Sequence, residues 1–134
     1  MSSAITSERV EVSADGDDVD LHYRTGGSGP PLVFLHGIGL DAATVSWRHA
    51  LPALAEDRTV YAPDLPGHGE SDKPNRAYTT AYYLETVEAF LDAIDVEEPA
   101  MAGLSMGGAL ALADRLWGIL LRASVSCGSH GLSL

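Results

Sequence analysis

The 134-residue sequence has little cysteine and no long apolar run. Its single cysteine, Cys127, has no second cysteine with which to form an intramolecular disulfide. No apolar stretch approaches the roughly 20 residues that a membrane-spanning helix needs. Residues 1–18 also lack the basic and apolar segments of a signal peptide. We therefore expect a cytoplasmic protein that does not enter a membrane.

Basic residues are also few, with 8 Lys and Arg against 19 Asp and Glu and a formal net charge of −11. Because nucleic-acid phosphates are bound by basic patches, this charge argues against a nucleic-acid partner. The acidity is typical of a solvated surface, and a surface adapted to high salt is the alternative that composition leaves open. The five histidines, at positions 22, 36, 49, 68 and 130, lack metal-ligand spacing, so we expect no metal and no other cofactor.

What the sequence does contain is a series of strand patterns, with 46% hydrophobic residues to build a core. Residues 9–15 and 19–27 alternate apolar and polar side chains on either side of the turn sequence GDD, which predicts an antiparallel hairpin. Three apolar runs, over 32–37, 59–65 and 100–105, are typical of strands buried on both faces of a parallel sheet.

Helices are predicted between and after these apolar runs. Residues 78–96 place apolar side chains at helical spacing, with Thr79 or Thr80 as the N-cap. A short helix is predicted from Pro52 to Glu56, and another over 107–118. Two opening strands followed by alternating strands and helices indicate an α/β domain with a mostly parallel sheet.

The sequence GLSMG places glycines two residues before and two residues after Ser105. A serine hydroxyl is a weak nucleophile that needs a base and must project into a cleft, which a sharp turn from strand to helix achieves. The flanking glycines, Gly103 and Gly107, relieve the crowding of such a turn. The alternative interpretation is a glycine-rich turn with a solvent-facing serine, which the strand before it and the helix after it disfavour.

A second feature follows the strongest predicted strand, where His36 and Gly37 stand at its end. Backbone N–H groups beyond that glycine are placed to face a substrate carbonyl. The N–H of Ile38, together with the N–H of Met106, is predicted to form an oxyanion hole.

Three stretches, LVFLHGIG, YAPDLPGHGESDKP and AGLSMGG, together resemble the α/β-hydrolase superfamily over roughly residues 8–117. The resemblance implies a partial α/β-hydrolase fold, with an antiparallel opening pair, a mostly parallel sheet and helices on both faces. It also implies Ser105 as the nucleophile and the backbone amides of Ile38 and Met106 as the oxyanion donors.

The resemblance further implies roles for residues around that site. Substrate contacts are expected from His36, Gly37 and Leu104. The side chains of His36 and His68 are expected to shape their loops rather than to act as the catalytic base. Asp64, at the end of its strand, is expected to hold the loop that follows.

The residue at position 105 is a serine, which limits the reactions that the resemblance implies. Family members that displace halide or open epoxides carry aspartate there. A serine indicates acyl-enzyme chemistry on a small-molecule ester, thioester, amide or activated C–C bond.

The catalytic triad of this family runs in the order Ser, acid, His. After Ser105 the only acidic residue is Asp114, which lies nine positions along a predicted helix, or roughly 13 Å away. The only later histidine is His130. We therefore expect the N-terminal half of such an enzyme, with the C-terminal strands, the triad acid and the triad histidine missing, and little or no turnover.

The domain is accordingly expected to be a single, incomplete unit over 1–134, with an atypical tail over 118–134 that has diverged or is frame-shifted after about residue 117. An incomplete sheet leaves an open edge, which favours self-association. The alternative function is a non-catalytic fragment, either a pseudogene product or a half-domain that binds a complementary chain.

Overall fold

The structure is a computed structural model of the chain, and it describes residues 4–37 and 42–115. The expectations for Ile38 and for the tail over 118–134 lie outside the described residues. The elements, in chain order, are β1 (Thr6–Ala14), β2 (Asp17–Gly27), β3 (Pro31–Leu35), α1 (Ala43–Ser46), α2 (Ala50–Leu54), β4 (Thr59–Pro63), α3 (Thr80–Ala93) and β5 (Ala100–Gly103). A further helix begins at residue 106 and is described as far as residue 115.

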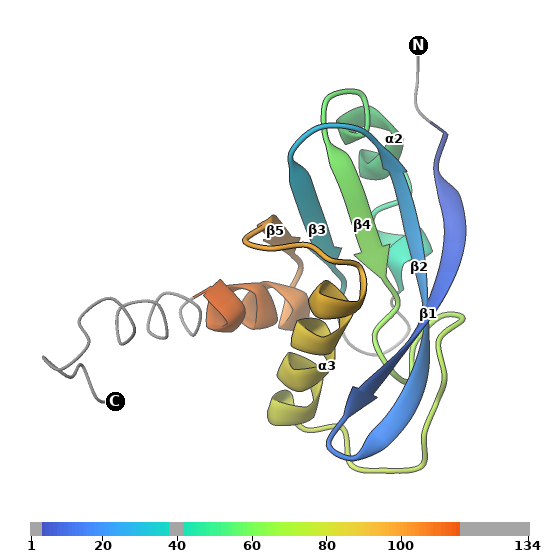
Figure 1. Cartoon of the computed structure of the whole chain (residues 1–134), viewed down its shortest axis with the longest axis vertical. Coiled ribbons are helices and arrows are strands. Elements are labelled where there is room, and N and C mark those ends of the chain that lie inside the picture. The colour runs from blue at the N-terminus through green and yellow to red at the C-terminus, as the bar shows by residue number, and fades with distance from the viewer. Residues whose placement is uncertain (1–3, 38–41, 116–134) are drawn as a thin grey trace, which may run out of the picture.

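The five strands form one sheet in the order β1-β2-β4-β3-β5 (Figure 1). The strand β2 pairs antiparallel with β1 and with β4, whereas β3 pairs parallel with β4 and with β5. The antiparallel opening pair is therefore confirmed. Both antiparallel pairings of the described sheet involve β2, and the strands that follow it run parallel, as the apolar runs predicted. The burial expected on both faces is not found for β5, whose residues are exposed or half-buried.

The opening hairpin turns at Asp15 and Gly16, whose φ angles are 51° and 80°. Two consecutive residues of positive φ match the twist of the flanking strands, and Asp-Gly is a favoured sequence for such a turn. The turn predicted at residues 16–18 was therefore placed too late, since Asp17 and Asp18 belong to β2.

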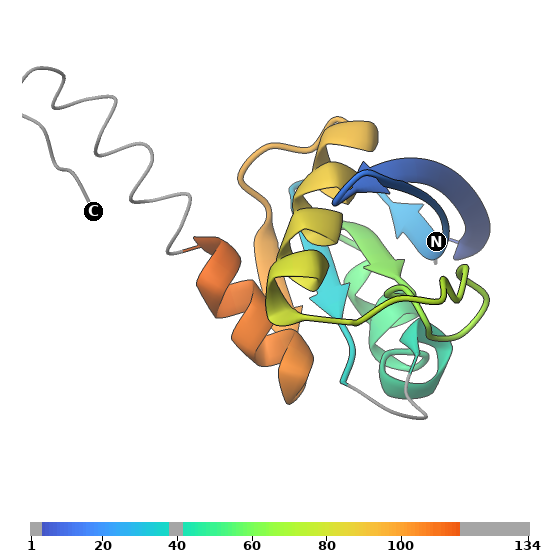
Figure 2. The same ribbon diagram turned by 90° about the horizontal axis from the view of Figure 1, so that it is seen from below.

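Helices cover both faces of the sheet, as expected (Figure 2). Alternate side chains of β3 point to opposite faces, which is the period of a strand. Val33 and Leu35 lie in one core cluster with α3 and with Leu110 of the last described helix. Phe34 lies in the second cluster, with residues of α1 and α2.

The helix α3 confirms the longest predicted helix, and the structure identifies which of the two candidate threonines is its N-cap. The Thr79 side chain accepts a hydrogen bond from the Tyr82 N–H at 3.1 Å, so Thr79 rather than Thr80 is the N-cap. The helix ends near Asp95, which adopts a left-handed φ of 57°. The described helices include none long and apolar enough to cross a membrane.

Candidate active site

Ser105 lies in the two-residue connection between the end of β5 and the helix over 106–115. Its φ is 56°, in the left-handed region that non-glycine residues rarely adopt, and the residue is exposed. Two backbone bonds hold the turn: the Leu104 N–H donates to the Leu35 carbonyl at 3.1 Å, and the Gly107 N–H donates to the Leu104 carbonyl at 2.9 Å. A strained, exposed backbone position of this kind is characteristic of functional sites.

The two glycines around Ser105 are required by how closely the turn approaches other backbone. A Cβ on Gly103 would lie 2.3 Å from the Gly107 carbonyl oxygen. A Cβ on Gly107 would lie 2.1 Å from the Leu35 carbonyl oxygen, at the end of β3. The glycine spacing predicted for a tight strand-to-helix turn therefore has a direct steric cause in the structure.

The helix that follows Ser105 supplies backbone donors. Met106 is its first residue, and the first N–H groups of a helix have no partner within the helix. The positive end of the helix dipole also favours negative charge at this point. The second predicted donor, Ile38, lies outside the described residues, so the oxyanion hole stays a prediction.

His36 is fully buried and bonded at both ring nitrogens. The Leu65 N–H donates to Nε2 at 2.9 Å, so Nδ1 carries the proton and donates to the Gly37 carbonyl at 2.5 Å. The ring therefore ties the end of β3 to the loop after β4. This geometry agrees with a loop-shaping role and leaves neither nitrogen available as the base for Ser105.

The loop after β4 is held by other buried polar groups. His68 is 7% exposed, with Nδ1 3.0 Å from the Pro66 carbonyl oxygen and its ring centroid 4.8 Å from that of His36. Asp64 accepts from the Ala43 N–H at 2.8 Å and from the Glu70 N–H at 3.0 Å. Asp64 therefore joins α1 to the loop, as expected of it.

Sequence reasoning missed one member of this network. His22 of β2 is buried and donates from Nδ1 to Asp64 Oδ2 at 2.8 Å, while its backbone N–H donates to Ser71 Oγ at 2.8 Å. The Ser71 hydroxyl in turn donates to the Asp64 carbonyl at 2.6 Å. These partners are more than 40 positions from His22 in sequence, so no local pattern signals the contact.

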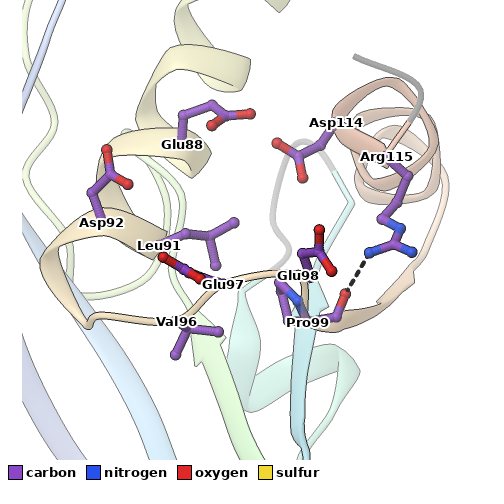
Figure 3. Close-up of a pocket in the computed structure, with 9 residues that line it drawn as sticks. All are labelled: Glu88, Leu91, Asp92, Val96, Glu97, Glu98, Pro99, Asp114 and Arg115. Atoms are coloured by element: carbon purple, nitrogen blue, oxygen red, sulfur yellow. Dashed lines mark hydrogen bonds between the residues drawn. The ribbon is translucent and has the colours of Figure 1, made fainter. Parts of the chain in front are cut away.

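Asp114 lies at the other end of the 106–115 helix from Ser105, and its carboxyl group faces Glu88 of α3 (Figure 3). Interaction with the Asp114 carboxyl group, burial, and the charges of Asp114 and Asp92 raise the pKa of Glu88 to about 7. Asp114 is thus placed against α3 and not beside the nucleophile. Among the described residues, no histidine and no carboxylate is hydrogen-bonded to Ser105.

A family model described as the alpha/beta hydrolase fold matches residues 30–113. The matched stretch is more than half of the chain, and it contains β3, β4, β5 and the turn at Ser105. The chain belongs to the α/β hydrolase fold family. The resemblance seen in the three sequence stretches is therefore confirmed.

The relatives of this α/β hydrolase chain include hydrolases whose names indicate different substrates. The chain is 38% identical over 105 residues to a 2-hydroxymuconate semialdehyde hydrolase of a Pseudomonas species, covering 77% of this chain and 36% of that protein. It is 35% identical over 111 residues to a soluble epoxide hydrolase of a Corynebacterium species, covering 83% and 37% respectively.

Solved structures agree on the fold. A meta-cleavage product hydrolase from Pseudomonas fluorescens superposes with a TM-score of 0.73 at 33% sequence identity, over 81% of this chain and 40% of that chain. The α/β hydrolase chain described here spans less than half the length of each of these relatives. Its residues therefore form a partial α/β-hydrolase fold.

The structure brings together part of the predicted site in this α/β hydrolase chain. Ser105 and Met106 lie on the same turn, and that turn touches the end of β3 through Leu35, next to His36. Leu104, which precedes the serine, is 50% exposed. The substrate contacts expected of His36, Gly37 and Leu104 stay predictions.

Proposed function

We propose that this chain carries the nucleophile of a serine hydrolase that acts on an ester or a related acyl bond of a small molecule. The observation that supports the proposal is the exposed, left-handed Ser105 between β5 and a helix N-terminus. An exposed serine at a sharp turn from strand to helix is what nucleophilic attack requires.

In the proposed reaction of the complete enzyme, Ser105 Oγ bonds to the carbonyl carbon as its proton passes to a histidine base, which the described residues do not place beside Ser105. The carbonyl oxygen takes up the negative charge and accepts hydrogen bonds from the N–H groups of Met106 and Ile38. The base then returns the proton to the leaving group, and water hydrolyses the acyl-enzyme. Removing one oxyanion donor typically costs on the order of 3 kcal/mol in the barrier.

Similarity to relatives supports hydrolysis but leaves two kinds of nucleophile to consider. The semialdehyde hydrolase and the meta-cleavage product hydrolase favour attack on a carbonyl compound, whereas the epoxide hydrolase favours ring opening. Opening an epoxide by covalent catalysis calls for a carboxylate at the turn. Because the turn carries Ser105, acyl or activated C–C bond hydrolysis is the better supported function.

The proposal includes a low activity for this chain by itself. His22, His36 and His68 are buried in bonds that hold the β4 loop, so none of them is placed to act as the base. Asp114 faces α3, so it is not placed to orient one. Loss of the triad acid alone can reduce the rate by about 10⁴.

The test is a chromogenic short-chain ester assay on the full chain, with Ser105→Ala as the control. We expect turnover within a factor of about two of the control. Robust hydrolysis that depends on Ser105 would support the nucleophile and contradict the low activity proposed for this chain. Hydrolysis that is equal in both proteins and well above the buffer rate would point to a nucleophile elsewhere.

A second candidate function is that of a half-domain that binds a complementary chain. In the described part of the chain, β5 pairs only with β3, and its residues are exposed or half-buried. Leu112, on the neighbouring helix, is 63% exposed. An open strand edge beside apolar side chains is a template for pairing with another strand.

A further inference from the structure

A pocket of about 290 Å³ lies between α3, the segment that leads to β5, and the far end of the 106–115 helix (Figure 3). Carboxylates dominate its polar lining: Glu88, Asp92, Glu97, Glu98 and Asp114. The pocket is separate from Ser105, because Asp114 stands nine positions further along the helix, or roughly 13 Å.

Asp114 supplies the observation that points to a ligand. Its side chain is only 9% exposed, and its Oδ1 is buried without a hydrogen-bond partner. In Figure 3 its carboxyl group is directed into the pocket. Because an unpaired buried acceptor carries a desolvation cost, a donor or a positive charge in the pocket would stabilise this side chain.

Glu88 adds a second carboxyl group at the same place. Its pKa is raised to about 7 by interaction with the Asp114 carboxyl group, by burial, and by the charges of Asp114 and Asp92. Two carboxyl groups that share a site resist ionising together, and a cation between them removes that resistance.

Arg115 is the one basic side chain among the described lining residues, and it does not satisfy Asp114. Its Nη1 donates to the Pro99 carbonyl at 3.2 Å, away from the carboxyl pair (Figure 3). The positive charge that the pocket favours must therefore come from a ligand.

We propose that this pocket binds a small organic polycation, a diamine or polyamine. Its ammonium groups donate to Asp114 and Glu88, and its methylene chain packs on Leu91 and Val96, which line the same pocket. A metal ion fits less well: within residues 4–37 and 42–115, no three His, Cys, Asp or Glu side chains are arranged to hold one. The volume also exceeds what a single ion fills. This inference does not depend on the proposed function.

The test is calorimetric titration of the full chain with spermidine at pH 8.5 and constant ionic strength. Asp114→Asn and Glu88→Gln are each expected to weaken binding by at least tenfold. Glu56→Gln is the matched control, because it removes one exposed carboxylate from the loop after α2, on the other face of the sheet. The control is expected to change the affinity less than twofold. Circular dichroism establishes that each variant is folded.

A measurement on the unaltered protein keeps the test independent of the variants. The NMR titration of the Glu88 carboxyl carbon is expected to move to a lower midpoint pH when spermidine is present, since an ammonium group favours the ionised carboxylate. Binding is likewise expected to be at least fivefold weaker at pH 6 than at pH 8.5.

Three outcomes would overturn the proposal. The first is no heat of binding beyond that of sodium chloride at equal ionic strength. The second is equal loss of affinity in Glu56→Gln and Asp114→Asn, which would indicate attraction to the net charge of −11 rather than to this pocket. The third is equally tight binding of magnesium chloride with the same dependence on Asp114, which would identify a metal site instead.

Discussion

Ser105 holds a left-handed backbone because the glycines beside it let the turn lie against the end of β3. A Cβ on Gly107 would lie 2.1 Å from the Leu35 carbonyl oxygen, which is too close for any side chain at this position. A Cβ on the next residue, Gly108, would lie 3.3 Å from its nearest neighbour, the Gly103 carbonyl oxygen. Position 108 therefore tolerates a small side chain far better than position 107.

Gly107→Ala is therefore expected to lower the free energy of unfolding by about 2–3 kcal/mol, since the methyl group forces the turn away from β3. For a domain of this size the thermal midpoint should fall by roughly 10 °C. Gly108→Ala should leave the midpoint nearly unchanged, because alanine also favours the helix in which it lies. Equal losses in the two variants, measured by thermal denaturation, would show that backbone approach at Gly107 is not the cause.

Residues of the candidate site were predictable from sequence where a local pattern specifies them. The turn at Ser105 follows from glycines at fixed offsets, and the loop-holding role of Asp64 was implied by the resemblance to the α/β-hydrolase superfamily. The contact of His22 with Asp64 joins residues 42 positions apart, and the pairing of Glu88 with Asp114 joins two helices. Contacts of this kind arise only when distant segments pack together, so they cannot be predicted from local patterns in a single sequence.

At the scale of elements, a side-chain hydrogen bond determines where α3 begins, and the spacing of apolar residues determines which face of α3 is buried. Thr79 and Thr80 were equivalent candidates for its cap, and the hydrogen bond from the Tyr82 N–H to the Thr79 hydroxyl distinguishes them. The buried face of α3 matches the helical spacing of its apolar residues, Tyr83, Val87, Phe90 and Leu91. The four-residue α1 was not predicted, because a single turn is too short to show a period.

Thr79→Ala is expected to reduce the free energy of unfolding by about 1 kcal/mol, because it removes the acceptor for a helix N–H. Thr80→Ala, inside the first turn, is expected to change it by less than half as much. Urea denaturation of the two variants measures the difference. A larger loss in the Thr80 variant would mean that the helix begins one residue later.

The contact between α3 and the 106–115 helix is expected to depend on pH through Glu88. Its folded-state pKa, about 7, lies above the ordinary value of 4.5, so folding favours the protonated form. Its stabilising effect is therefore complete below pH 4.5 and is lost as the pH rises through 7.

Glu88→Gln should accordingly raise the free energy of unfolding at pH 8, by up to about 1 kcal/mol, since water screens a side chain that is largely exposed. At pH 4.5 the variant and the unaltered chain should agree. Urea denaturation at the two pH values measures the effect, with Glu56→Gln as the control. A gain of the same size at both pH values would rule out titration of Glu88 as its origin.

At the scale of the whole molecule, the described sheet ends at β5, with an exposed strand and an exposed Leu112 beside it. We expect the chain to associate as its concentration rises, through pairing at this edge. Size-exclusion chromatography with light scattering, over a hundredfold range of concentration, measures the mass. A folded monomer across that range would argue against both self-association and the half-domain function.

The central claim is that the turn after β5 presents Ser105 as a nucleophile. The most direct measurement is peptide mass spectrometry of the chain after incubation with p-nitrophenyl acetate. Because the helix N-terminus beside Ser105 stabilises negative charge on the carbonyl oxygen even where no base assists, we expect a slow, single acetylation of Ser105. It should be at least tenfold faster than acetylation of any other hydroxyl, and the label should be absent from this peptide in Ser105→Ala. Acetylation spread over the serines and threonines, with no preference for Ser105, would contradict the claim.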